Sequence, residues 1–238
     1  MIVAIHQPNL FPRLKVLQKL AFADSWIVLD DVQFAQREYQ NRAYFFPTTE
    51  GQPPRWCSLP VSLPYGRDTR IQDVLASPGG ISRVRNVLDA CFSETGDAAW
   101  ESLAGGYEPS RPLVSAGIAT TVNLLKNVSA PHILLASQLR TEALPRSEGI
   151  AQLCSLVGAD TYLADSGAAA YLDITLLGRS GVDVVWQVWA DPGRWHDELD
   201  GIDCRNGSAL NILCRLPDRY TELLEVTSFA RSKERALQ

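Results

Sequence analysis

The 238-residue sequence lacks the excess of basic residues that nonspecific binding of nucleic acid requires. It has 22 lysine and arginine residues against 27 aspartates and glutamates, which gives a formal net charge of −5. A protein that grips phosphate backbones without reading the bases needs a basic face. The composition therefore argues against sequence-independent nucleic-acid binding, although a local basic patch is compatible with it.

Long apolar runs and paired cysteines are also missing. No stretch approaches the roughly 20 apolar residues that a membrane-spanning helix needs, and the sequence does not start with a charged segment followed by an apolar one. The five cysteines are odd in number, without a CxxC pair or a histidine at zinc-binding spacing. Such cysteines are typical of reduced thiols packed in a core. We expect a cytoplasmic protein with no membrane segment and no metal site.

The common motifs for cofactors and activated nucleophiles are absent. There is no GxGxxG after a strand, no Walker loop, no GxSxG elbow and no HExxH in the sequence. We therefore expect no cofactor, and the chemistry must come from residues outside these motifs.

The most informative pattern lies at the start of the chain. Residues 2–5, which are mostly β-branched, predict a strand buried on both faces in a parallel sheet. Pro8 and Pro12 forbid a continuation of that strand. His6 and Gln7 therefore fall at its carboxyl end.

A helix and a second strand follow this turn. Apolar residues recur at helical spacing over residues 14–21, and residues 26–29 predict a strand that ends on Asp30 and Asp31. Together they form a right-handed βαβ unit. Ligands of open α/β sheets bind beyond the carboxyl ends of the strands, and both polar groups of residues lie there.

The remaining sequence predicts an α/β fold with a mainly parallel sheet, helices on both faces in three layers, and a small antiparallel addition in the middle segment. The predicted strands cover 43–46, 55–61, 132–136, 161–164 and 182–189, and the helices cover 81–91, 113–126, 147–157, 172–177, 208–213 and 220–226. Residues 96–112, with three glycines and two prolines, are the best candidate for a linker, with a short helix around Trp100 and Leu103 inside it as the alternative. We expect one domain over 1–238, with a division into 1–105 and 112–230 as the alternative, and a frayed tail from Arg231.

His6 is the strongest candidate for chemistry. It is one of three histidines and lies in a polar turn, where an imidazole that titrates near neutrality can act as a general acid or base. The competing interpretation is that His6 caps the turn by hydrogen bonding to backbone amides. Its position in the sequence does not separate the two.

Further polar residues are expected at the same edge of the sheet. One of Asp30 and Asp31 can orient His6 or bind a substrate ammonium group, and the other is more simply a solvated strand end. Amides and a guanidinium in the following loop can grip a carboxylate or phosphate. The other residues placed in this loop or at the ends of later strands are Gln33, Asn41, Arg42, Ser137, Asp165, Ser166 and Gln187.

Several motifs resemble those of the WbqC-like protein family. The run IHQPNLFP is followed by ADSWIVLDDVQF and YQNRAYF, and the likeness continues in WCSLPVS, LLASQL, LVGADTYLADSGAAAYLD and GVDVVWQVW. The combination of HQPN, DDVQF and QNR at these spacings is specific, and the resemblance covers most of the chain. One departure is Gln36, at a position where the family usually has lysine.

The resemblance implies a bacterial cytoplasmic protein of polysaccharide (O-antigen) or natural-product biosynthesis. Members of the family are suggested to make amide bonds by acyl or aminoacyl transfer. The residues that match the family pattern are His6, Gln7, Asn9, Asp30, Asp31, Gln33, Asn41, Arg42, Asn123, Ser137 and Gln187.

We therefore expect a cofactor-independent acyl or aminoacyl transferase that forms an amide bond on a small amine, such as an amino sugar or a natural-product intermediate. His6 is the general base, and Gln7, Asn41 and Arg42 position the donor or stabilise the oxyanion. The acyl donor is a carrier-protein thioester or an aminoacyl-tRNA. A homodimer is compatible with the sequence.

Two other classes of function stay open. At the level of fold, a strand ending in histidine, a proline-containing turn, a helix and a strand ending in acid also resemble nucleotidylyltransferases and pantoate ligases. This keeps an ATP-dependent ligase or nucleotidyl transferase as the first alternative. The second alternative is a non-catalytic binding subunit of a biosynthetic pathway.

Overall fold

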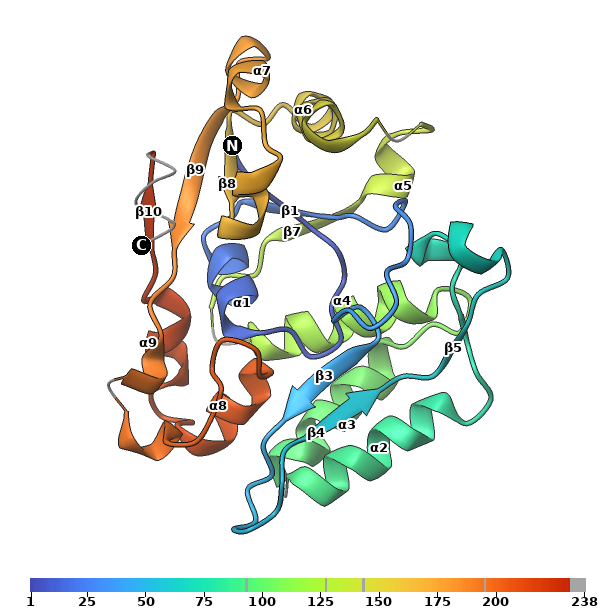
Figure 1. Ribbon diagram of the computed structural model, residues 1–238, viewed down its shortest axis with the longest axis vertical. Helices are drawn as coiled ribbons and strands as arrows, with labels where there is room; N and C mark the ends of the chain where they lie inside the picture. The colour runs from blue at the N-terminus through green and yellow to red at the C-terminus, as the bar shows by residue number, and fades with distance from the viewer. Residues whose placement is uncertain (93, 127, 143, 195, 232–238) are drawn as a thin grey trace.

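A six-stranded sheet lies at the centre of the computed structural model, which describes residues 1–92, 94–126, 128–142, 144–194 and 196–231. The strand order within these residues is β10-β9-β8-β1-β2-β7 (Figure 1). The strands are β1 (Ile2–His6), β2 (Ser25–Val28), β7 (His132–Leu135), β8 (Thr161–Ala164), β9 (Asp183–Val188) and β10 (Ser228–Ala230). All neighbours pair in parallel except β10, which runs antiparallel to β9 at one edge.

Helices cover both faces of this sheet. Side chains alternate along β1, so Ala4 joins the core that contains α1 and α4, whereas Val3 and Ile5 join the core beneath α6 and α7. The helices of this part are α1 (Leu14–Ala21), α4 (Pro112–Leu124), α5 (Ala136–Leu139), α6 (Arg146–Val157), α7 (Ile174–Arg179), α8 (Ala209–Arg215) and α9 (Tyr220–Glu225). The predicted α/β fold in three layers is confirmed.

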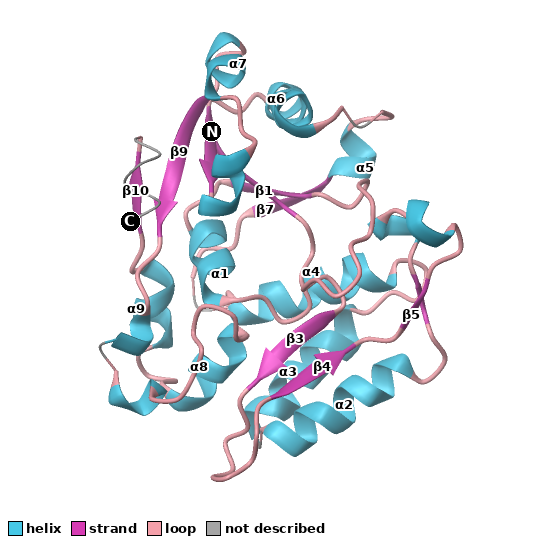
Figure 2. Cartoon of the chain, in the orientation of Figure 1, coloured by secondary structure: helices cyan, strands magenta, loops and turns pink. Residues whose placement is uncertain are grey.

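The long connection between β2 and β7 forms the predicted antiparallel addition. Figure 2 shows its strands in magenta beside the helices that they pack on. They pair as two separate two-stranded sheets and do not extend the central one. The elements are β3 (Arg42–Phe45), β4 (Arg55–Ser58), β5 (Val61–Ser62), β6 (Leu75–Ala76), α2 (Gly80–Cys91) and α3 (Glu94–Gly106).

The predicted linker over residues 96–112 is wrong, because most of it belongs to helix α3. Leu103 of α3 is fully buried, and α3 packs on both α2 and α4. Gly106 permits the close approach to α4, since a methyl group on it would lie 2.6 Å from the Ala119 Cβ atom. Tertiary packing thus overrides the low helix propensity of glycine.

The described part also contains short 3-10 helices at Gly66–Asp68, Ile71–Asp73, Ser166–Ala170, Pro192–Arg194 and Asp197–Leu199. Strand β10 was not predicted, and the predicted frayed tail lies outside the described residues from 232 onward.

All five cysteines are free, and burial raises the pKa of Cys154 to about 12 and that of Cys204 to about 11. These thiols are protonated and pack in the core, as expected.

Candidate functional site

A proline-containing turn leaves the sheet at the carboxyl end of β1. His6 is the last residue of β1, and Pro8 and Pro12 lie in the turn that leads to α1. The imidazole Nδ1 lies 2.8 Å from the Gln7 carbonyl oxygen. A neutral ring that donates from Nδ1 to this carbonyl keeps an unprotonated Nε2 as a proton acceptor. His6 as a residue is half-buried at this strand end.

Helix α4 holds this turn in place. A methyl group on Gly117 would lie 2.5 Å from the Pro8 Cβ atom, so only glycine permits this approach. Thr120 Oγ1 accepts a hydrogen bond from the Phe11 backbone N–H at 3.0 Å. Phe11 has a φ of 45°, which a bulky side chain rarely adopts. The surrounding contacts therefore fix a strained backbone at Phe11, in the turn that follows His6.

The order of strands changes direction at β1. The chain places β2 and β7 on one side of β1 and β8 and β9 on the other, so the switch point lies between β1 and β8. His6 ends β1 and Asp165 follows β8, while α1 presents Lys19 to the same edge. Lys19 Nζ lies 3.1 Å from Asp165 Oδ2, with side chains 2% and 31% exposed respectively. Ligands of doubly wound sheets bind at this position.

Burial and charge keep His6 neutral. Burial, followed by the positive charge of Lys19, lowers the pKa of His6 to about 4, although Asp165 acts in the opposite direction. Lys19 in turn holds the pKa of Asp165 well below its usual range. Burial and the nearby Arg13 lower the pKa of Lys15. At neutral pH the site therefore combines an uncharged imidazole, an ionised carboxylate and a crowded set of cations.

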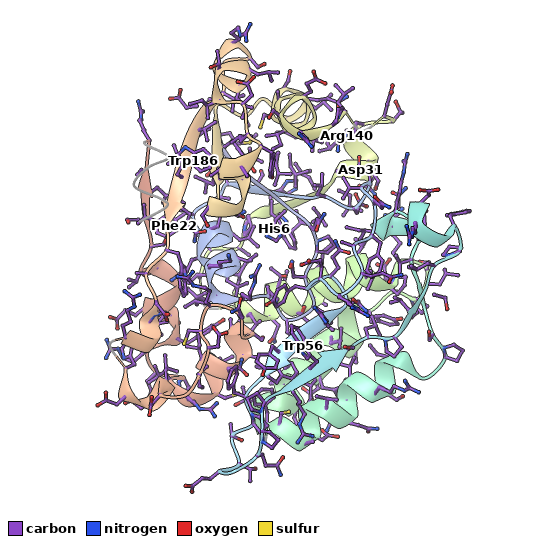
Figure 3. The ribbon with its side chains drawn as sticks, in the orientation of Figure 1. His6, Phe22, Asp31, Trp56, Arg140 and Trp186 are labelled. Carbon is purple, nitrogen blue, oxygen red and sulfur yellow. The ribbon has the colours of Figure 1, made fainter. Side chains whose placement is uncertain are left out.

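Asp31 lies beside Arg140 and away from His6 (Figure 3), and Asp30, its neighbour after β2, has its partner after β7. Asp30 accepts hydrogen bonds from Ser137, from its backbone N–H at 2.9 Å and its hydroxyl at 2.7 Å. Asp31 forms a buried ion pair with Arg140. Both carboxylates thus anchor the segment at α5, and the carboxylate whose charge acts on His6 is Asp165.

Gln7 is oriented by the loop that follows β2. The Gln40 Nε2 atom donates to Gln7 Oε1 at 2.8 Å, and the Gln40 Oε1 atom accepts from the Ala35 backbone N–H at 3.0 Å. Gln40 is buried and was not predicted as a site residue. Its contacts fix the orientation of the Gln7 side-chain amide and leave the Nε2 atom as a donor.

Three predicted residues of this loop bind within the middle segment. Gln33 is exposed, and its Nε2 atom donates to the Arg67 carbonyl oxygen. Asn41 Nδ2 donates to the Leu59 carbonyl at 3.1 Å. The Arg42 guanidinium lies 4.0 Å from the centre of the Trp56 ring. The structure therefore uses these side chains to hold the loop and β3–β4 together.

The other predicted residues lie in α4, in β9 and in the segments that follow β1 and β8. Gln187 is buried and donates to the Lys15 carbonyl at 2.8 Å, which ties β9 to α1. Ser166 is exposed directly after Asp165, whereas Asn123 lies half-buried in α4. Asn9 is buried in the turn. Gln187 and Ser166 are thus near the switch point.

The sequence analysis missed Lys15 and Lys19 as site residues. They are four positions apart in α1 and so lie on one face of the helix. Lys19 is buried, although lysine is almost never fully buried unless it is paired. The sequence held one indication of this site, which was a lysine next to the apolar stripe of α1. Its partner Asp165 is distant in sequence, so the ion pair itself could not be predicted.

A pocket of about 490 Å³ opens at the end of β2. Its lining is mainly apolar and consists of Leu29, Val32, Arg140, Leu144, Arg146, Gly149, Ile150, Leu153, Ala170 and Tyr171. The charge of Asp165, after burial, contributes to raising the pKa of Tyr171. Ala170 and Tyr171 belong to the segment that follows Asp165 after β8, so this segment forms one wall of the pocket.

Neither a metal centre nor a membrane span is found in the described part of the chain. No three His, Cys, Asp or Glu side chains are grouped there to hold a metal ion. No helix within those residues is long and apolar enough to cross a membrane.

These features define a doubly wound α/β protein with a neutral histidine and a lysine–aspartate ion pair at its switch point. A family model described as the WbqC-like protein family matches residues 7–198. The chain belongs to this family. An uncharacterised protein of Mycobacterium tuberculosis, Rv1507c, is 23% identical over 203 residues, which are 77% of this chain and 80% of that protein. The comparison with solved structures gave no match.

Proposed function

We propose that the protein transfers an acyl or aminoacyl group to a small amine and forms an amide bond, with His6 as the general base. The supporting observation is the neutral imidazole at the switch point, beside the Lys19–Asp165 ion pair. Because Nδ1 is hydrogen bonded to Gln7, the Nε2 atom is the proton acceptor.

The proposed reaction begins when the amine nitrogen attacks the carbonyl carbon of the donor. A C–N bond forms, and the proton leaving the nitrogen moves to His6 Nε2. The bond between the carbonyl carbon and the sulfur or oxygen of the donor then breaks, and the imidazolium returns the proton to that leaving group. The negative charge of Asp165 offsets part of the unfavourable effect that burial and Lys19 have on the transient imidazolium.

The positive surroundings favour an uncharged amine. Burial and neighbouring cations already lower the pKa of Lys15. An amine bound nearby experiences the same effect, and it therefore loses its proton more readily than in water. Once the amine has attacked the carbonyl carbon, its nitrogen is much more acidic than before. A base with a pKa of about 4, such as His6, suits the removal of the proton at that stage.

Two further features support group transfer. Gln40 holds Gln7 so that the Gln7 Nε2 can donate to the developing oxyanion. The apolar pocket beside Tyr171 offers about 490 Å³ for the acyl group. We propose a carrier-protein thioester or an aminoacyl-tRNA as the donor, and a cytoplasmic role in polysaccharide or natural-product biosynthesis.

The test uses the purified full chain without ATP. Acyl and aminoacyl thioesters of coenzyme A are combined with amino sugars and other primary amines, and amide products are measured by mass spectrometry. We expect amide formation with at least one pair. His6→Gln should reduce turnover by about 10²- to 10⁴-fold, the usual contribution of general-base catalysis. Arg83→Gln, an exposed change on α2, is the control and should leave turnover unchanged.

Three outcomes contradict the proposal. Parental turnover in folded His6→Gln shows that His6 is not the base. Failure of every thioester and amine pair, with product appearing only after addition of ATP and magnesium, identifies the ATP-dependent ligase instead. That second candidate is supported by the basic residues Arg13 and Lys15 at the start of α1, where phosphates bind in related folds. Binding of substrates without any conversion identifies a non-catalytic subunit.

A further inference from the structure

Two segments far apart in sequence meet at the start of α1. The Ala209 backbone N–H donates to the Pro12 carbonyl at 2.9 Å, and Arg13 pairs with Ser208 in an isolated antiparallel bridge. Arg205 lies in the turn just before Ser208 and is exposed. These contacts place the Arg205 segment beside Arg13.

A third segment completes the arrangement. Gln187 of β9 donates to the Lys15 carbonyl at 2.8 Å. Trp189 follows just beyond β9, and the Arg205 guanidinium lies 5.4 Å from the centre of its ring. The charges of Arg13 and Arg205 both act on Lys15, so these three cations are neighbours at the start of α1, and we call them the basic cluster.

The basic cluster has an excess of positive charge. None of its three members takes part in the ion pairs found among the described residues. The nearby carboxylates offset part of this charge, and Asp165 acts on Lys15 less strongly than Arg13 does. Asp165 binds Lys19, and Asp203 accepts the backbone N–H groups of its own turn. Asp191 likewise accepts a backbone N–H of its own turn.

Among the described residues, Arg13 carries one donor atom without a partner and Trp189, beside Arg205, carries another; the Arg13 guanidinium lies 4.1 Å from the centre of the Tyr39 ring. The two donor atoms are the buried Arg13 Nε and Trp189 Nε1. Helix α1 begins at Leu14 with no side-chain cap and no acidic residue in its first turn. The positive end of its dipole therefore adds to the field of the basic cluster. Buried donors are normally satisfied, and an anion would supply the missing acceptors.

We propose that the basic cluster binds a phosphate group carried by a substrate of the proposed transfer reaction. A phosphate brings close to two negative charges and several acceptor oxygens, which match three cations and two orphan donors. The inference rests on the proposed function, because that function places the reaction beside His6. Phosphate bound here holds the rest of the substrate at the imidazole. The phosphate can belong to a nucleoside diphosphate on the acceptor or to a phosphopantetheine arm on the donor.

The experiment measures binding to the purified chain by calorimetry at constant ionic strength. The probes are pyrophosphate, uridine diphosphate, phosphopantetheine and, as a singly charged control, acetate. We expect at least one phosphate probe to bind at least tenfold more tightly than acetate. Arg13→Gln and Lys15→Gln should each weaken that binding by about tenfold or more. Arg83→Gln removes the same charge from an exposed site on α2 and should change nothing.

The phosphate probes also identify the source of the group. Tighter binding of uridine diphosphate points to the acceptor, and tighter binding of phosphopantetheine points to the donor. A second readout is the His6 imidazole resonance in NMR, because a bound phosphate should raise the pKa of His6. Arg205→Gln, which changes an exposed side chain, serves if a variant at Arg13 fails to fold.

Equal binding of acetate and all phosphate probes overturns the inference, as does an equal loss of binding in Arg83→Gln. Failure of the phosphate-binding inference can be distinguished from failure of the proposed function. His6→Gln should keep phosphate binding and lose turnover. Lys15→Gln should lose phosphate binding and raise KM for the phosphorylated substrate more than it lowers kcat.

Discussion

Arg140 grips the Asp31 carboxylate with two parallel hydrogen bonds, from Nε to Oδ2 at 2.7 Å and from Nη2 to Oδ1 at 3.1 Å. The two side chains are 3% and 5% exposed. Arg140 Nη1 also donates to the Gly149 carbonyl and to Gln152 Oε1. The pair therefore joins the end of β2 to α6, which gives Asp31 a structural partner.

We expect Asp31→Asn to destabilise the protein by about 3–5 kcal/mol, because it leaves a buried guanidinium without its counter-charge. Urea denaturation monitored by circular dichroism measures this change. The control is Arg219→Ala, which removes an exposed ion pair with Glu222 and should not alter the midpoint detectably. An unchanged free energy of unfolding in Asp31→Asn, with lost activity, would mean that Asp31 acts in the reaction.

His6 should make stability depend on pH. Its pKa falls from 6.5 to about 4 on folding. The unfolded chain therefore binds more protons between these values, and stability is lost as pH falls from about 6.5 to 4. The upper limit is about 3 kcal/mol, at 1.36 kcal/mol for each pKa unit. Denaturation of the parental protein and His6→Gln at pH 7.0 and 4.5 measures the difference. Parallel pH profiles of the two proteins would show that His6 titrates normally.

The contact between Thr120 and the turn after His6 can be tested on its own. Thr120→Val removes the acceptor of the buried Phe11 N–H, and we expect a loss of about 1–3 kcal/mol in the free energy of unfolding. Thr121→Val is the matched control, because the Thr121 hydroxyl donates only within its own helix, to the Gly117 carbonyl. The Phe11 amide should exchange with deuterium faster in Thr120→Val only. Equal effects of the two changes would rule out a specific role for Thr120.

Adjacent glycines at the end of α3 should respond in opposite directions to alanine. Gly105→Ala adds a methyl group to open space and should stabilise the helix by about 0.5–1 kcal/mol. Gly106→Ala forces that group against Ala119 and should destabilise by about 1–3 kcal/mol. Thermal unfolding measures both. If residues 94–106 were a linker, neither change would matter.

The apolar pocket gives a prediction about acyl length. Ile150 lines the pocket, and Ile150→Trp fills part of it. We expect turnover with long acyl donors to fall about tenfold or more relative to acetyl donors. Leu156→Trp on the same helix is the control, since Leu156 is exposed and outside the lining. A uniform loss with all donors, or no loss with any, would place the acyl group elsewhere.

The start of the chain shows how far local pattern reaches. The apolar run of β1, the two prolines and the periodicity of α1 predicted the strand, the turn and the helix because each depends on neighbours in sequence. The same local pattern failed at α3, where Gly106 is selected by contact with Ala119 in another helix. Local propensity cannot register such a contact.

The sequence by itself determined the α/β class, the parallel sheet and the position of His6 at a strand end, since period and proline placement act over a few residues. Only the tertiary structure decided which charges meet. Lys19 and Asp165 are 146 positions apart, and Asp31 and Arg140 are 109 apart. A carboxylate binds whichever cation the folded backbone brings within a few ångströms. For that physical reason, the charged groups that act on the pKa of His6, Lys19 and Asp165, became visible only once β1, β8 and α1 were packed together.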